Sequence, residues 1–230
     1  MADTVMTNAQ KNDVPPEQKK RGIYLTVGIA LLFVAVILGI FIHGMTRPQI
    51  LSDADLKAKG TFLFDNPRSF KPFSLVDYNN QSFSPENLQG KWSLVFFGFT
   101  FCPDVCPTTL ALLNRFYQQQ QEAGMAEDLQ IILVSVDPGR DTPEKLSLYV
   151  KYFNPEFLGV TGEFLDLHRF ATQLNIPFSK VPGGGENYTV EHGGNVAIIN
   201  PNGHYIGFFR APLTLGKFNI GYESIRATRD

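Results

Sequence analysis

The chain has 230 residues, of which 43% are hydrophobic and 18% are charged, and its formal net charge is −2. These values are typical of a globular domain with an additional apolar segment. No segment of the sequence concentrates basic residues, so nucleic-acid binding has no electrostatic support.

The N-terminal part predicts one membrane anchor. Residues 1–22 are polar and predict a disordered head. Residues 23–42 carry no charge, and twenty helical residues span about 30 Å, the hydrocarbon thickness of a bilayer. A cleaved signal peptide and a buried core helix are the alternatives. A signal peptide is disfavoured because its apolar core has about 7–15 residues and because residues 41–45 make a poor cleavage site.

The charges that flank this segment predict its orientation. Lys19, Lys20 and Arg21 precede the apolar run, whereas Arg47 is the nearby cation that follows it. The positive-inside rule therefore places the N-terminus in the cytoplasm. We expect a single-pass protein of the bacterial inner membrane, in contact with lipid, with its folded domain in the periplasm. Mitochondrial import is disfavoured because the head lacks the Arg/Ser-rich amphipathic pattern of a transit peptide.

The remaining chain predicts a tether and one α/β domain. Residues 43–70 are expected to be the tether, with a short helix at Asp53–Lys59, and residues 71–230 the domain. Its predicted elements are a hairpin strand at 73–78, strands at 92–99, 129–136 and 157–160, helices starting near 107, 142 and 163, strands at 188–192, 196–199 and 205–209, and a helix near 214. Strands alternating with helices predict right-handed crossovers and a central mixed sheet with flanking helices, a thioredoxin-like arrangement.

Cys102 and Cys106 are the only two cysteines, and they lie between a buried strand and a helical pattern. A helix start favours thiolates, and residues four apart share a helix face. The pair could bind one metal ion, form one redox disulfide, or alternate between these states. Two thiolates select soft metals, above all Cu(I), with zinc as the main competitor. A purely structural disulfide is disfavoured, because so short a loop contributes only about 2 kcal/mol.

Two sulfurs leave most metals incompletely coordinated, so a third ligand is expected at the same edge of the sheet. His43 lies at the membrane boundary, His168 on a predicted helix and His204 in a predicted turn. His192 differs because it ends a predicted strand and precedes two glycines, which allow a close approach. A satisfied loop histidine remains the alternative interpretation of His192.

Three motifs in this order resemble those of one family. They are FGFTFCPDVCP at 97–107, DPGRDTP at 137–143, and VEH at 190–192 followed by NPNG at 200–203. The chain is similar to the Sco/SenC family of membrane-tethered, thioredoxin-like proteins, which help load copper into cytochrome c oxidase. The match covers roughly residues 70–225. The chain departs from the usual pattern at Glu191, where aspartate is common, and at Gly193, where serine is common.

The resemblance implies a copper ion bound by Cys102, Cys106 and His192. It also implies that the two cysteines can form a redox disulfide. The expected partner is the oxidase subunit that carries the copper site, and other periplasmic copper chaperones or thiol reductants are further candidates. Folding must then bring the His192 imidazole within bonding reach of a sulfur pair 86 positions earlier.

Two supporting features are predicted beside this ligand set. Asp137 ends the strand next to the cysteine strand, so its carboxylate is expected to approach the site, although a role as a turn acceptor is an equal alternative. The glycine loop at 183–185 is expected to let His192 move away when metal leaves.

Other functions compete with copper delivery. A thiol–disulfide oxidoreductase acting on the cysteines of the oxidase copper site is the main alternative, although such enzymes use Cys-x-x-Cys rather than the spacing seen here. A peroxidase is disfavoured because position 103 is proline where peroxiredoxins have threonine. A passive scaffold would leave the cysteine and histidine set unexplained. Because copper delivery changes no bond of a substrate, we do not expect an enzyme.

Overall fold

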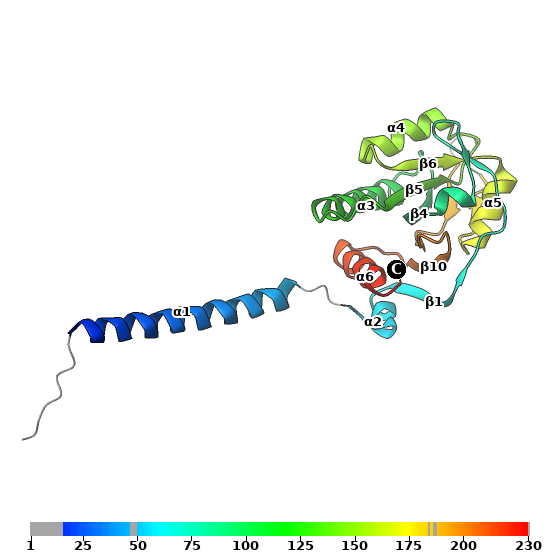
Figure 1. Cartoon of the computed structure of the whole chain (residues 1–230). Helices are drawn as coiled ribbons and strands as arrows, with labels where there is room; N and C mark the ends of the chain where they lie inside the picture. Colours follow the sequence, from blue (N-terminus) through cyan, green and yellow to red (C-terminus); the bar gives the residue numbers. More distant parts are fainter. Residues whose placement is uncertain (1–15, 47–49, 184, 186–187, 230) are drawn as a thin grey trace, which may run out of the picture. The chain divides into compact units, whose positions relative to one another are not determined.

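The computed structural model describes residues 16–46, 50–183, 185 and 188–229. The chain divides into two compact units, residues 1–47 and 48–230. In the first unit, helix α1 runs from Pro16 to Thr46 (Figure 1). Its segment Tyr24–Gly44 is long and apolar enough to cross a membrane. The prediction of a disordered head is therefore wrong for residues 16–22, which belong to helix α1. Residues 1–15 of the predicted head lie outside the described residues.

The second unit is built around an eight-stranded mixed sheet in the order β1-β10-β9-β4-β5-β6-β2-β3. Its strands are β1 (Thr61–Arg68), β2 (Leu75–Asp77), β3 (Ser82–Phe83), β4 (Trp92–Gly98), β5 (Leu129–Ser135), β6 (Leu158–Thr161), β9 (Val196–Ile199) and β10 (Tyr205–Phe209). Strands β4, β5 and β6 are parallel, whereas β9 runs antiparallel to β4. A separate ribbon pairs β7 (Phe178–Lys180) with β8 (Val190–His192). The expected mixed sheet and thioredoxin-like fold are confirmed.

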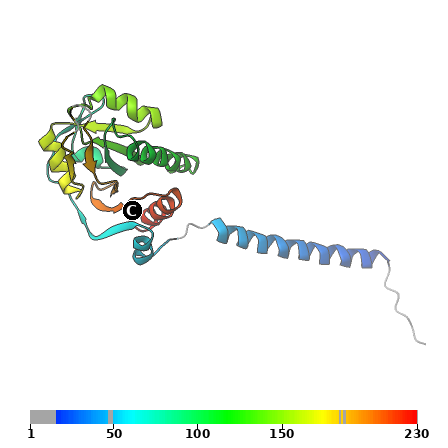
Figure 2. The same cartoon turned by 180° about the vertical axis from the view of Figure 1, so that it is seen from behind.

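Helices cover both faces of this sheet (Figures 1 and 2). They are α2 (Asp53–Ala58), the 3-10 turn η1 (Pro85–Leu88), α3 (Val105–Glu122), α4 (Pro143–Phe153), α5 (Phe164–Gln173) and α6 (Leu215–Arg229). Phe116 of α3 packs edge-to-face on Phe218 of α6, while Phe170 of α5 packs on Phe97 of β4 from the other face. The sequence explains α4 locally, because Thr142 caps it by accepting a hydrogen bond from the Lys145 amide and Pro143 occupies its first position.

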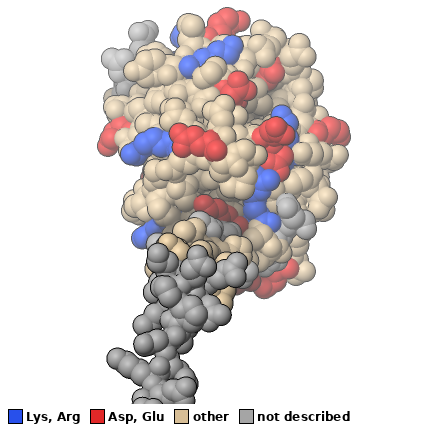
Figure 3. All heavy atoms as spheres, turned by 60° about the vertical axis from the view of Figure 1, so that its left-hand side comes forward, with Lys and Arg blue, Asp and Glu red and all other residues tan. Residues whose placement is uncertain are grey.

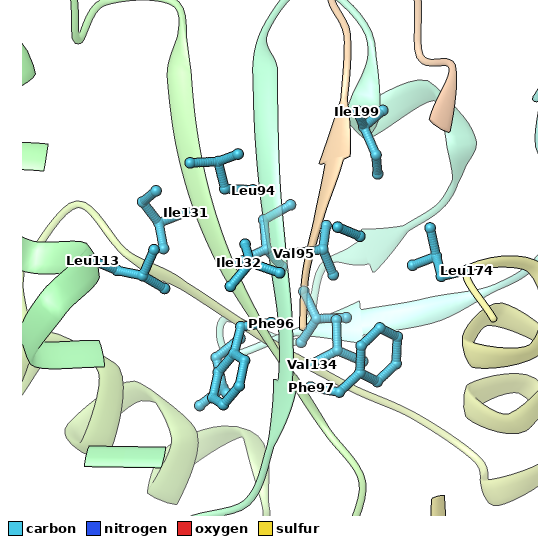
Figure 4. Close-up of a cluster of buried hydrophobic side chains, with 14 of the residues drawn as sticks. Leu94, Val95, Phe96, Phe97, Leu113, Ile131, Ile132, Val134, Leu174 and Ile199 are labelled. Atoms are coloured by element: carbon cyan, nitrogen blue, oxygen red, sulfur yellow. The ribbon is translucent and has the colours of Figure 1, made fainter. Parts of the chain in front are cut away.

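The core lies on both sides of β4 and β5. Every residue of β4 is buried, as expected for a central strand covered on both faces. Figure 4 shows β4 and β5 side chains between Leu113 of α3 on one side and Leu174, which follows α5, on the other. This rigid centre fixes the loops that leave the carboxyl ends of β4 and β5.

The prediction of a tether at residues 43–70 is wrong for residues 61–68, because these residues form β1. The folded domain therefore begins before residue 71. Strand β1 pairs antiparallel with β10 at an edge of the sheet. The Phe62 and Phe208 rings stack with their centroids 5.1 Å apart. Pro67 is compatible with this strand because an edge strand does not need every amide for pairing.

Charged side chains show no segregation on the face drawn in Figure 3, where acidic and basic groups are interspersed. A single-sign field is the footprint of a nucleic-acid-binding surface. The face drawn in Figure 3 has no such single-sign field.

Candidate metal centre

Three elements bring the proposed ligands together. Cys102 lies in the turn between β4 and α3, Cys106 is the second residue of α3, and His192 ends β8. The two Sγ atoms and a ring nitrogen of His192 all lie within 4.8 Å of one another. The structure therefore places the imidazole within reach of the sulfur pair, although 86 positions separate His192 from Cys106.

The two cysteines were expected to share one face of a helix, but the structure brings their sulfurs together in another way. Helix α3 begins at Val105, so Cys102 precedes the helix. The backbone amide of Cys106 donates a hydrogen bond to Sγ of Cys102 at 3.4 Å. The Cys102 sulfur thus accepts one of the amide donors that a helix start leaves without a partner inside the helix.

Gly98 at the end of β4 allows Cys106 to pack directly on the sheet. A Cβ atom at position 98 would lie 2.9 Å from Sγ of Cys106, closer than packed atoms tolerate. Cys106 itself is fully buried. A side chain at position 98 would therefore push the sulfur out of its position.

The hydrogen bonds of the His192 ring define its useful nitrogen. Nδ1 lies 3.2 Å from the carbonyl oxygen of Gly193, which can only accept, so Nδ1 carries the proton and donates it. Nε2 then presents its lone pair toward Sγ of Cys106, 3.6 Å away. Metal-binding histidines are commonly oriented in this way by a backbone carbonyl. Sequence reasoning could not name this partner, because it is a main-chain atom.

Aromatic rings enclose the imidazole. Phe96 and Phe99 pack edge-to-face against His192, with ring centroids 6.0 and 5.9 Å from that of the imidazole. Burial lowers the pKa of His192, and the hydrogen bond to Gly193 opposes this only in part. The ring is therefore neutral at pH 7 and able to coordinate a metal.

Burial also determines the pKa of the Cys106 thiol, contrary to the expectation from the sequence. A helix start was expected to favour the thiolate, but burial, and then the hydrogen bond with Cys102, raises the pKa of the Cys106 thiol far above its ordinary value. The nearby Asp141 raises it further. Desolvation exceeds the helix-start effect here, so Cys106 holds its proton until a cation displaces it.

This raised pKa predicts a pH-dependent copper affinity. Between pH 7 and 9 we expect affinity to rise at least tenfold per pH unit, since binding must release the Cys106 proton. His192 contributes little in this range because its lowered pKa leaves it already neutral. Competition with a chelator of known affinity at each pH would measure the slope. A slope that flattens below about pH 8.5, the ordinary thiol pKa, would contradict this account of Cys106.

Asp137 occupies a supporting position beside β8. Its buried carboxylate accepts hydrogen bonds from the Tyr188 hydroxyl and from Nε of Arg140, and Tyr188 lies two residues before β8. Its main-chain oxygen accepts from the amides of Arg140 and Asp141, which is the expected turn role. Asp137 as a direct neighbour of the metal stays a prediction.

Asp141 has the structural role at the cysteine turn that sequence reasoning missed. It is 1% exposed, and its carboxylate accepts hydrogen bonds from the amide and hydroxyl of Thr100 and from the hydroxyl of Ser135. These bonds tie the turn before Cys102 to the end of β5. The sequence does offer one indication of a structural role for Asp141, because this residue directly precedes Thr142, the cap of helix α4.

We expect Asp141→Ala to lower the free energy of unfolding by about 1–3 kcal/mol, because it leaves buried donors unsatisfied. Asp141→Asn is the matched control and should cost less, since the amide oxygen can still accept from the Thr100 amide. Urea unfolding of the copper-free protein would compare them. Equal losses in both variants would show that the carboxylate charge, rather than the hydrogen bonds, matters.

The other histidines and the glycine loop complete the set of residues singled out by the sequence. His168 is exposed on α5, and His204 is half-buried beside the turn before β10. In the glycine loop, Gly183 and Gly185 have positive φ values of +101° and +55°, while Gly184 lies outside the described residues. Movement of His192 through this loop stays a prediction.

Most of the folded domain matches one family of known proteins. A family model described as SCO1/SenC matches residues 65–216. The chain belongs to the SCO1/SenC family. A Stutzerimonas stutzeri protein, provisionally named a copper-binding protein, is 40% identical over 172 residues, which cover 74% of this chain and 84% of that one.

Solved structures of SCO1/SenC proteins show the same fold with and without metal. The crystal structure of Arabidopsis thaliana ScoI with copper bound matches with a TM-score of 0.64 and 30% identity, covering 68% of this chain and 98% of that one. The solution structure of apo Sco1 from Thermus thermophilus matches with a TM-score of 0.63 and 31% identity, covering 73% of this chain and 95% of that one.

Proposed function

We propose that this protein is a membrane-anchored copper chaperone that helps assemble a copper centre of cytochrome c oxidase. The observation that carries the proposal is the convergence of Cys102, Cys106 and His192, whose ligand atoms lie within 4.8 Å of one another. Membership of the SCO1/SenC family supports copper as the cargo, since relatives have been solved with copper bound.

The ligand spacing suits one soft ion. Thiolate and imidazole ligands bind metals at about 2.0–2.3 Å, so three ligands around a trigonal ion lie about 4 Å apart. The observed upper separation of 4.8 Å needs a contraction of about 1 Å. Two sulfurs and one nitrogen match the preference of Cu(I).

The exposure of the ligands suggests how copper leaves. A hollow of about 240 Å³ opens over the site, and its lining residues are Phe99, Cys102, Pro103, Asp104, Val105, Thr189, Val190, Glu191 and His192. Cys106 is buried behind it. An incoming thiol of the oxidase subunit would reach the ion through this hollow, and the partner's ligands would replace those of the chaperone one at a time.

The anchor supports delivery at a membrane. Segment Tyr24–Gly44 can span a bilayer, and the cations of residues 19–21 favour a cytoplasmic N-terminus. The copper-binding domain would then face the periplasm of a bacterial inner membrane, where it can meet the oxidase subunit.

A thiol–disulfide oxidoreductase is the second candidate, because both cysteines are free thiols with adjacent sulfurs. In that mechanism Cys102, the more accessible cysteine, would attack a partner disulfide and Cys106 would resolve the mixed disulfide. The raised pKa of Cys106 would slow this resolving step, because the thiolate is the nucleophile. The chaperone is favoured instead because His192 lies with both sulfurs, and the exchange of disulfides does not need a third ligand.

One experiment separates the two functions. The full chain in detergent is mixed anaerobically with the soluble copper domain of the oxidase subunit, prepared either metal-free and reduced or with its cysteines oxidised. The chaperone predicts copper transfer from the loaded protein to the reduced domain. Reduction of the oxidised domain by the copper-free protein, without any copper transfer, would contradict it and support the oxidoreductase.

A further inference from the structure

Helix α4 carries a second apolar stripe that the fold does not use. Leu146 and Val150 are buried on its inner side. On its outer side, Leu148 and Tyr152 are 77% and 84% exposed. A surface helix ordinarily has one apolar stripe, which faces the core. The outer stripe is therefore available for a contact outside this chain.

This stripe lines a hollow together with the turn that carries Cys102. The hollow, of about 450 Å³, is lined by Thr100, Phe101, Lys145, Leu148, Tyr149 and Tyr152, and we call it the α4 hollow. Phe101 is 56% exposed and directly precedes Cys102. Phe101 thus lines the α4 hollow, while its chain neighbour Cys102 lines the hollow over the metal site.

Cations hold the exposed Phe101 ring in place. The Arg140 guanidinium lies 4.8 Å from the ring centroid and the Lys145 ammonium 5.6 Å from it. Lys145 also donates a hydrogen bond to the carbonyl oxygen of Arg140, which fixes its own position. An anchor that is ordered before contact loses less conformational entropy on binding.

Exposed apolar side chains gather around this site. Eight large apolar side chains are exposed among the described residues of the folded domain. Four of them, Phe101, Val105, Leu148 and Tyr152, line the α4 hollow or flank the cysteines in sequence. Isolated exposed apolar residues need no explanation, but a contiguous group marks an interaction site.

We propose that the α4 hollow docks the copper recipient, which inserts an apolar side chain into it and places a carboxylate opposite Lys145. This inference rests on the proposed function. A recipient thiol must come within about 2.3 Å of the ion to replace a ligand, so the recipient's surface must cover the Cys102 turn, where Phe101 projects. Lys145 is the charged residue among those lining the hollow, which selects an acidic neighbour in the partner.

The test measures copper transfer from the full chain in detergent to the metal-free soluble copper domain of the oxidase subunit. The Leu148→Ser/Tyr152→Ser double variant should slow the second-order transfer rate about tenfold or more, as expected for removal of an aromatic anchor. Its copper affinity should stay within twofold of wild type, because neither side chain is a ligand. Leu165→Ser on α5, where Leu165 is 66% exposed, is the matched control and should transfer at the wild-type rate.

The contribution of the Lys145 charge to docking is tested separately. Lys145→Glu should slow transfer and remove the decrease that added salt causes in the wild-type rate, because salt screens a favourable pair.

Several results would overturn the docking inference. One is an unchanged transfer rate in the double variant despite unchanged copper affinity. Another is conversion of a wild-type dimer to a monomer by the same substitutions, since a second copy of the chain would then be the occupant. Wild-type protein that binds copper but transfers none would overturn the chaperone function and this inference together, whereas slow transfer by the double variant alone supports both.

Discussion

Replacement of His192 with alanine should lower the affinity for Cu(I) by about 100-fold or more. Loss of a residue that only orients a ligand costs about 10–100-fold, and His192 is proposed to be a ligand itself. Its Nε2 faces Sγ of Cys106 at 3.6 Å, and the bond from Nδ1 to Gly193 fixes the ring. The variant would keep two thiolates, which bind copper without the third donor. Anaerobic competition with a Cu(I) chelator measures the change.

Two controls make this result specific. His168→Ala removes an exposed histidine from α5 and should leave copper affinity unchanged. Free imidazole added to His192→Ala should partly restore binding, since the alanine leaves space between Phe96 and Phe99. If His192→Ala keeps full affinity, the cysteine pair alone explains binding, and the oxidoreductase becomes the better hypothesis.

The largest loss of stability is expected from Gly207→Ala in β10. An added Cβ would overlap the carbonyl oxygen of Phe62 in the neighbouring strand β1, and it would lie 3.0 Å from Cα of Leu63. Because both are backbone atoms, no side-chain rotation relieves the contact and the β1–β10 pairing must shift. We expect a loss of about 3 kcal/mol, at the upper end for overpacking. Urea unfolding of the copper-free protein measures it.

Gly216→Ala is the matched control for this substitution. Gly216 lies in α6, and a Cβ there would have nothing within 4 Å. Alanine should therefore be neutral or stabilise the protein by up to about 1 kcal/mol, as in an exposed helix. A Gly207→Ala variant as stable as Gly216→Ala would mean that β1 does not pair closely with β10 in solution.

Local sequence patterns predicted most of the domain because its central elements have strong signals. The uncharged run of β4, the Thr142-Pro143 cap of α4 and the amphipathic spacing of α5 each identify an element without knowledge of the rest. Strand β1 lacks such a signal. Asp65, Asn66 and Pro67 indicate a turn, and the strand forms because β10, about 140 residues later, offers an edge to pair with. Pairing at that separation is not encoded in local periodicity.

The candidate site shows the same division between local and long-range information. Ligand identity follows from residue type and motif, so Cys102, Cys106 and His192 could all be named. The state of the Cys106 thiol could not, because it depends on burial beneath the Cys102 turn, and burial opposes the helix-start effect. Asp141 was missed for a related reason. Its partners Thr100 and Ser135 come from two other segments, and only the fold brings them to one carboxylate.

The two edge strands of the sheet, β1 and β3, affect how readily the domain aggregates when many copies are close together. At one edge β3 has two residues, and at the other β1 contains Pro67 and an irregular register. Short or proline-interrupted edges give a neighbouring copy little backbone to extend. A protein held at a membrane by an apolar segment such as Tyr24–Gly44 meets its own copies often, and these short or interrupted edge strands would protect it from strand-to-strand aggregation.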